Sequence, residues 1–227
     1  MNSRLIKIIA ALTMLIDHIG AILFPYAYWL RVIGRIAFPL FCFLIAYGCI
    51  KTRNINKFAF RLLWFGIACQ IILSLASWQW WYPSNIFFTL LSGVALIVLI
   101  KKFSSTRPHH IILLVAGSTL ILALTHFAQF DYGIPGVLLI VTFYLVLNKK
   151  PIETAKLMSI PILLLFNITF LIIFGVAYFI QFFSFLACIF IIFFTDKQLR
   201  ISKFEKWGFY IFYPLHLVIL MMIALLI

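Results

Sequence analysis

Residues 5–23 read LIKIIAALTMLIDHIGAIL, an apolar run that carries two ionisable residues, Asp17 and His18, in its second half. A run of about 20 apolar residues is long enough to cross the hydrocarbon core of a membrane as an α-helix. A cleaved signal peptide would end at a small-residue cleavage site, which this run lacks. We therefore predict a first transmembrane helix that is retained.

Apolar runs of similar character continue to the end of the 227-residue chain. The sequence is 66% hydrophobic with a mean hydropathy of +1.18, whereas soluble domains are about 45–50% apolar. The fold class predicted is an all-α polytopic membrane helix bundle of about nine transmembrane helices, with eight or ten as alternatives, forming a single domain over residues 1–227. The eight further runs are 32–50, 58–77, 86–100, 111–128, 133–147, 157–174, 177–194 and 209–227.

The connecting segments differ in charge and predict the orientation. Segments 51–61, 101–107, 149–156 and 197–206 are rich in Lys and Arg, whereas 78–83 and 129–132 contain neither and carry Trp and Tyr. Basic segments stay cytoplasmic, which predicts a cytoplasmic N-terminus and an outer C-terminus, with Arg31 as the one outer exception. The same bias explains the net charge of +13, so we expect no nucleic-acid partner.

Cysteine and histidine spacing argues against a metal site. The four cysteines lie inside apolar runs without metal-ligand spacing, and the histidines lack an i, i+4 pair. We expect no metal and no disulfide framework.

Polar residues recur at one predicted depth of the membrane. Ionisable side chains are rare in membrane spans, and each is a candidate functional residue. Eight such residues, drawn from four predicted helices, fall in the outer half of the membrane: Asp17, His18, Arg31, Arg35, Asn85, Thr89, His126 and Asp131. A structural interpretation, in which ion pairs and amides hold helices together, stays open for each residue.

His18 and Asp17 are the candidate catalytic residues. As neighbours on a helix they point about 100° apart and do not easily pair with each other. We expect His18 to accept a proton, since a histidine titrates near neutral pH, and Asp17 to be neutralised by Arg31 or Arg35. His216 follows Pro214 in the last run and is expected nearer the cytoplasmic side, as a candidate binding residue or as a hydrogen-bonding group beside a proline kink.

Six blocks in order along the chain resemble the TraX family, which is a specific match over nearly the whole sequence. The blocks are TMLIDHIG (13–20), LRVIGRIAFPLF (30–41), KTRN with RLL (51–54 and 61–63), NIFFTL (85–90), DYGIPGVLL (131–139) and FYIFYPLHL (209–217). The resemblance implies an integral-membrane acyltransferase of the bacterial inner membrane. Such an enzyme takes acetyl groups from cytoplasmic acetyl-CoA, as the family namesake does when it acetylates the N-terminal amine of an F-type pilin.

The resemblance also assigns roles to residues. By analogy His18 would be the base, and acetyl-CoA would be the co-substrate. Its phosphates would lie near the basic residues Arg53 and Arg61, while Arg35 or Asn85 would stabilise the oxyanion. The acceptor would be a pilin-like subunit or an envelope glycan or lipid. Two other functions fit the sequence: a proton-coupled transporter of small solutes or lipids, and a pilus-assembly factor without catalysis.

Overall fold

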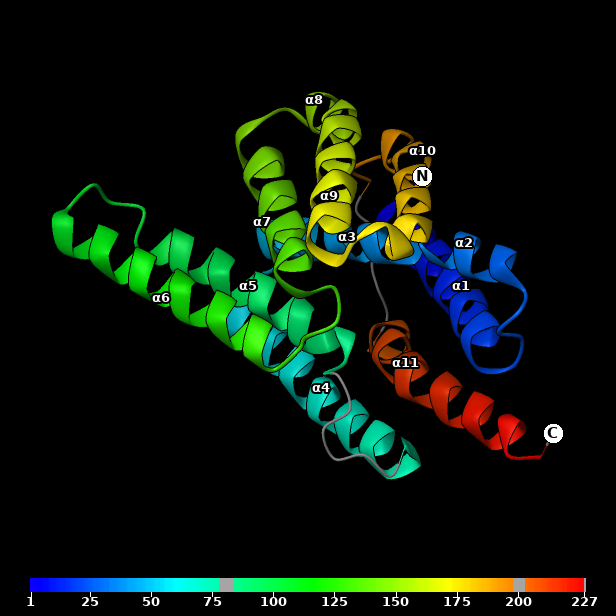
Figure 1. The fold of residues 1–227 in the computed structure, drawn as a ribbon. Helices are drawn as coiled ribbons and strands as arrows, with labels where there is room; N and C mark the ends of the chain where they lie inside the picture. Colours follow the sequence, from blue (N-terminus) through cyan, green and yellow to red (C-terminus); the bar gives the residue numbers. More distant parts are fainter. Residues whose placement is uncertain (78–83, 198–202, 227) are drawn as a thin grey trace. The chain divides into compact units, whose positions relative to one another are not determined.

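The computed structural model describes residues 1–77, 84–197 and 203–226 and is helical in these ranges, with one isolated bridge between Ser84 and Phe130 (Figure 1). The helices are α1 (Ser3–Ile22), α2 (Tyr28–Gly34), α3 (Ala37–Lys51), α4 (Ile55–Ser77), α5 (Ile86–Lys102), α6 (Pro108–Phe127), α7 (Gly133–Lys149), α8 (Ile152–Leu157), α9 (Ser159–Phe174), the 3₁₀ helix η1 (Val176–Leu186), α10 (Ala187–Ile192) and α11 (Lys203–Ala224).

The all-α membrane class is confirmed. Six helical segments among the described residues are long and apolar enough to cross a membrane: Ser3–Ile22, Tyr28–Lys51, Ile55–Leu75, Pro108–Phe127, Ile152–Phe174 and Trp207–Ala224. Two shorter apolar helices, Gly133–Lys149 and Tyr178–Ile192, accompany them. The count of nine spans and the side of the N-terminus stay predictions. The aromatic segment 78–83 and most of the basic segment after residue 197 lie outside the described residues.

Helix α1 shows why this chain belongs in lipid. Its buried face carries small and polar residues at helical spacing, including Ala10, Thr13, Asp17 and Gly20. Leucine and isoleucine side chains such as Leu5 and Leu12 are exposed on the other face. A soluble helix buries its large apolar residues, and the inverse arrangement is expected where lipid covers the outer face and small residues allow close helix packing.

One of the predicted spans is interrupted, and two neighbouring runs are separated where the sequence predicted a boundary. The second run is split into α2 and α3 at Arg35 and Ile36, although Arg35 N still donates to Arg31 O at 3.1 Å. The seventh and eighth runs are separated at Gly175, whose φ of 85° lies in the region that favours glycine. Beyond Gly175 the chain forms η1 rather than an α-helix and packs against α9.

Contacts divide the chain into two compact units, each of which we describe by itself. The first unit contains residues 1–44 and 149–227, and the second contains residues 45–148, so α3 begins in one and ends in the other. The prediction of a single domain over residues 1–227 stays a prediction.

In the first unit α1 packs against α2 and α11, and α2 packs against η1. Lys7 lies 5.8 Å from the ring centroid of Phe209, and His18 contacts His216, so α1 and α11 run in the same direction. Both are long enough to cross a membrane.

In the second unit α5 packs against α4 and α6 (Figure 1). A Cβ on Gly93 would lie 2.7 Å from the Ile140 side chain, so the glycine lets α5 and α7 approach closely. At the basic end of α5, Lys101 Nζ donates to Cys49 O at 2.7 Å and thereby ties α5 to the end of α3.

Candidate functional site

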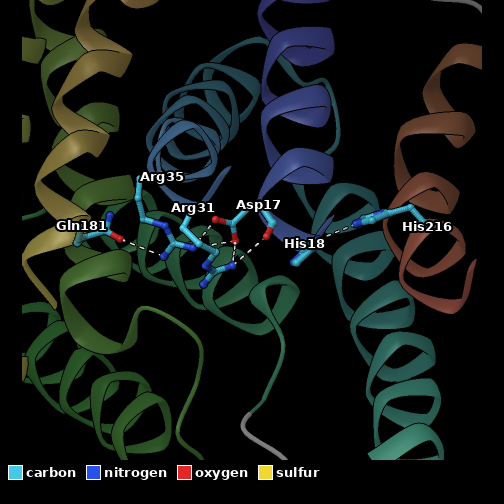
Figure 2. Close-up of polar contacts among 6 residues, drawn as sticks. All are labelled: Asp17, His18, Arg31, Arg35, Gln181 and His216. Atoms are coloured by element: carbon cyan, nitrogen blue, oxygen red, sulfur yellow. Dashed lines mark hydrogen bonds and ion pairs between the residues drawn. The ribbon is translucent and has the colours of Figure 1, made fainter. Parts of the chain in front are cut away.

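Helix α1 presents its two adjacent ionisable residues to different neighbours. Asp17 faces α2, and His18 faces α11 (Figure 2). The predicted angular separation of the two side chains is confirmed, because each has its own partners and they do not bond to each other in the described structure.

Asp17 is paired with both arginines. Arg31 Nη1 lies 2.6 Å from Asp17 Oδ2, and Arg35 Nη2 lies 2.6 and 2.7 Å from the two carboxylate oxygens (Figure 2). Arg31 Nη1 also donates to the main-chain oxygen of Asp17 at 3.1 Å. The sequence predicted one arginine partner or the other, and the structure has both.

Gly34 allows this approach. A Cβ at Gly34 would overlap the Cβ and carboxyl group of Asp17, so a side chain at this position and the observed place of Asp17 exclude each other. Gly20 acts similarly on α1, where a Cβ would lie 2.7 Å from the Cβ of Leu30. Small residues on both helices therefore bring the buried carboxylate within reach of the arginines.

Gln181, on η1, adds a group that the sequence analysis missed. Its Oε1 accepts from Arg35 Nη1 at 3.4 Å, and the residue is 2% exposed (Figure 2). The sequence does contain a feature that could have indicated it, because Gln181 is the single amide in the apolar run 177–194. Polar groups inside spans are candidate functional residues, and the same rule singled out Asp17.

His18 and His216 form a hydrogen-bonded pair. His18 Nδ1 lies 2.7 Å from His216 Nε2, with ring planes inclined by 26°. His216 Nδ1 lies 2.6 Å from the main-chain oxygen of Phe212. The ring of Tyr213 meets both imidazoles edge-on, at centroid distances of 5.8 and 5.6 Å.

These partners fix which nitrogen carries each proton. The Phe212 carbonyl oxygen only accepts, so His216 Nδ1 is the donor. In a neutral imidazole the other nitrogen is then an acceptor, so His216 Nε2 accepts from His18 Nδ1. The neutral His18 is left with its Nε2 as an acceptor, which is the form that a general base needs.

The expectation that His216 lies nearer the cytoplasmic side than His18 was wrong, because the two rings are in contact. The prediction counted from residue 209, where the apolar run begins, but α11 begins at Lys203. His216 therefore lies about 20 Å along its helix, close to the distance of His18 from the start of α1. Apolar runs mark the hydrocarbon core, whereas a helix can begin before it. The alternative of a helix-bundle hydrogen bond also holds, in the contact with His18 of α1.

Asn85 and Thr89 lie in the second unit. Asn85 caps α5 by accepting from Phe87 N at 3.1 Å, and its Nδ2 donates to Gly66 O at 2.9 Å and Gln70 Oε1 at 3.0 Å. Thr89 Oγ1 donates to the main-chain oxygen of Asp131, an exposed residue in the loop after α6. These contacts give Asn85 and Thr89 structural partners, and their roles in binding stay predictions, as does that of Asp131.

Of the remaining three candidates, two are exposed and Arg61 is half-buried. Arg53 lies exposed between α3 and α4, and the Arg61 guanidinium is 5.8 Å from the ring centroid of Phe58. His126 is exposed in the last turn of α6. No group of three metal-ligating side chains occurs in the part of the chain that the structure describes.

The fold and the site define a polytopic helical membrane protein with a buried ion-pair and histidine cluster where α1 meets α2 and α11, and where η1 meets α2. The chain belongs to the TraX family: the sequence model of that family, described as "TraX protein", matches residues 2–224.

Proteins that are similar in sequence match parts of this chain. "Protein TraX" of Escherichia coli is 30% identical over 142 residues, which cover 62% of this chain and 54% of that protein. "Protein TraX" of Escherichia coli strain K12 is 28% identical over 138 residues, 60% of this chain and 52% of that protein. "Probable fimbrial assembly protein FimC, serogroup H1" of Dichelobacter nodosus is 36% identical over 69 residues, 29% of this chain and 28% of that protein. The chain thus matches about half the length of the E. coli relatives. No solved structure matches it.

Proposed function

We propose that this protein is an acetyl-CoA-dependent acetyltransferase of the bacterial inner membrane, with His18 as its general base. The acetyl group would move from cytoplasmic acetyl-CoA to an amine or hydroxyl at the outer side of the membrane. The acceptor class is a pilin N-terminus or an envelope glycan or lipid. Membership of the TraX family and the buried histidine pair support this proposal.

The observation that carries the proposal is the hydrogen-bond chain from the Phe212 carbonyl through His216 to His18. It orients the His18 ring and leaves Nε2 able to take a proton. A general base fixed in one tautomer by a second group is a recurring arrangement in acyl transfer.

The reaction balances with His18 alone as the proton carrier. His18 Nε2 takes the proton of the acceptor amine or hydroxyl as that group attacks the thioester carbonyl carbon. The new C–N or C–O bond forms, the C–S bond breaks, and the imidazolium of His18 returns the proton to the CoA thiolate. Asp17 holds Arg31 and Arg35 beside the base, where their positive charges can balance a developing oxyanion.

A non-catalytic assembly factor is the second candidate. The similarity to a protein named for fimbrial assembly favours it, because binding a pilin-like subunit needs no base. A proton-coupled transporter would also use buried ionisable groups. Both alternatives predict that the purified protein releases no CoA.

The test is acetyl transfer by the full chain in lipid nanodiscs. Labelled acetyl-CoA is supplied with peptides bearing a free N-terminal amine or with glycan hydroxyls, and CoA release is measured. His18→Ala should lower turnover about 100-fold or more while its thermal stability stays close to that of wild type.

The control for this test is His109→Ala, which alters an exposed histidine near the start of α6 and should leave turnover unchanged. If His18→Ala keeps wild-type turnover, another residue is the base. If the wild type releases no CoA with any acceptor, the assembly factor is favoured. Mass spectrometry of envelope components from a deletion strain would then identify or exclude an acetylated product.

A further inference from the structure

The second unit has its basic residues at one end. Lys57 lies in the first turn of α4, α5 ends with Lys101 and Lys102, and Arg107 immediately precedes α6. Helix α5 packs against both α4 and α6, and Lys101 ties its end to Cys49, near the end of α3. Only three residues separate α3 from α4. The ends of three neighbouring helices therefore carry Lys57, Lys102 and Arg107, which we call the basic rim.

Acidic side chains of the second unit do not balance this charge. The unit contains seven Lys and Arg residues and a single acidic residue, Asp131. The main-chain oxygen of Asp131 accepts from Thr89, which lies about 20 Å along α5 from Lys102. Asp131 is therefore at the opposite end of the unit from the basic rim.

The rest of the chain has too few acidic residues to supply the balance. Outside the second unit there are four: Asp17, Glu153, Asp196 and Glu205. Asp17 is bonded to two arginines and Glu153 to a lysine, all within the first unit. Even if both of the others served the second unit, at least five of its seven positive charges would lack an acidic side chain to balance them. A partner outside the chain is therefore expected at this end.

The position of the basic rim on its helices indicates the kind of partner. On α4, Lys57, Phe60 and Trp64 share one face at i, i+3 and i+7, and the two aromatic residues are 58% and 56% exposed. On α6, Ile111 follows Arg107 at i+4 and is 50% exposed. Large apolar side chains exposed on a membrane span contact the acyl chains of lipid. A basic residue that ends such a face extends to the level of the headgroups.

We propose that the basic rim binds the headgroups of anionic phospholipids, such as phosphatidylglycerol. The recognised group is a phosphate, and clusters of Lys and Arg directly beside membrane spans attract anionic lipid. Orientation of the protein in the membrane requires basic residues on one side of it, but not on lipid-facing helix faces, where Lys57 and Arg107 lie. The phosphates of CoA share this chemistry, and the test separates the two sources. This proposal goes beyond acetyl transfer and does not depend on it.

The test measures how strongly the full chain prefers phosphatidylglycerol to phosphatidylcholine. The protein is equilibrated with mixtures of the two lipids, and the lipid molecules that it retains are counted by native mass spectrometry. The wild type should retain phosphatidylglycerol preferentially. In the triple variant Lys57→Gln, Lys102→Gln and Arg107→Gln, this preference should fall about 10-fold or more, because each basic residue beside an anionic surface contributes to the attraction.

The matched control changes the same three residues and keeps their charge. Lys57→Arg, Lys102→Arg and Arg107→Lys together should leave the preference for phosphatidylglycerol close to that of the wild type. If this variant loses as much of the preference as the neutral one does, the effect comes from altered packing of the helix ends and the proposal fails.

Other outcomes also decide the matter. A wild type without preference for phosphatidylglycerol overturns the proposal, and so does a neutral variant that keeps it. If CoA displaces phosphatidylglycerol from the wild type and binds the neutral variant more weakly, the rim serves a soluble ligand and the proposal fails. Should the triple variant fail to fold, Arg107→Gln alone replaces an exposed residue and should lower the preference about five-fold. Because no turnover is measured, failure of acetyl transfer leaves this result intact, and the reverse.

Discussion

Buried polar residues have different kinds of hydrogen-bond partners in the two units. In the second unit, the amide of Asn85 bonds to the backbone and to Gln70, so it closes the junction between α4 and α5. In the first unit, Asp17 bonds to side chains from across a helix interface, and those bonds involve full charges. The nearby Gln181 keeps a donor for a further partner.

The kind of hydrogen-bond partner, backbone or charged side chain, distinguishes scaffold residues from site residues better than the residue type does. An amide whose capacity is used by neighbouring backbone contributes to the fold, and its replacement should change stability alone. A charged group held by other side chains can exchange those partners for a ligand, and its replacement should change function as well as stability.

The largest effect is expected when the Asp17 ion pairs are broken. Asp17→Asn removes the carboxylate that pairs with both guanidinium groups and should cost about 3–5 kcal/mol of unfolding free energy, the range known for buried pairs in soluble proteins. Asp17→Asn with Arg35→Gln should recover much of that loss but not turnover, because we expect the arginine to serve the substrate too. Thermal stability and acetyl transfer are measured for the single and double variants, and the series is repeated with Arg31→Gln.

The control for that series is Glu153→Gln. Glu153 pairs with Lys156 at 2.6 Å, but its side chain is 77% exposed, so the loss should stay below about 1 kcal/mol. If a double variant restores both stability and turnover, the arginine replaced in it has only a structural role. The two units would then not differ in how they use buried polar residues.

A smaller effect is expected at Gly34. Gly34→Ala forces its new methyl group into Asp17 and should cost up to about 3 kcal/mol, together with most of the turnover. Gly48→Ala adds the same methyl group at a position where the Phe58 ring is 3.6 Å away, an ordinary contact, and should be neutral or slightly stabilising. Equal melting temperatures for the two variants would show that Asp17 has room to move.

The smallest effect is expected in the second unit. Gln70→Leu removes the acceptor of Asn85 N at 3.1 Å and of its Nδ2 at 3.0 Å, which should cost about 1–2 kcal/mol. Turnover per folded molecule should stay normal if this cluster is scaffold. A collapse of turnover with stability retained would instead place Asn85 in the site, as the sequence analysis proposed.

The sequence predicted the features that depend on composition. Apolar length indicated the helical membrane class, and the rarity of buried charge singled out Asp17 together with its arginine partners. The contact between His18 and His216 was not predicted, because it depends on the residue at which α11 begins. An apolar run does not mark that residue.

Gln181 illustrates a second limit. An amide in an apolar run is equally compatible with holding a helix in place and with offering a donor to a ligand. Asn167 does the first, since its Nδ2 donates to Leu163 O at 2.8 Å and its Oδ1 accepts from Ser184. The three-dimensional arrangement shows that Gln181 faces a guanidinium group, which the sequence alone does not.

The 3₁₀ conformation of η1 also changes how far a short segment of chain can reach. A 3₁₀ helix rises about 2.0 Å per residue, against 1.5 Å for an α-helix. Beyond a kink at Tyr178, residues 179–186 of η1 and the six residues of α10 therefore extend over about 25 Å, whereas an α-helix of the same length would extend about 21 Å. The hydrocarbon core is about 30 Å thick. The 3₁₀ conformation thus brings this short segment closer to the length that a membrane span needs.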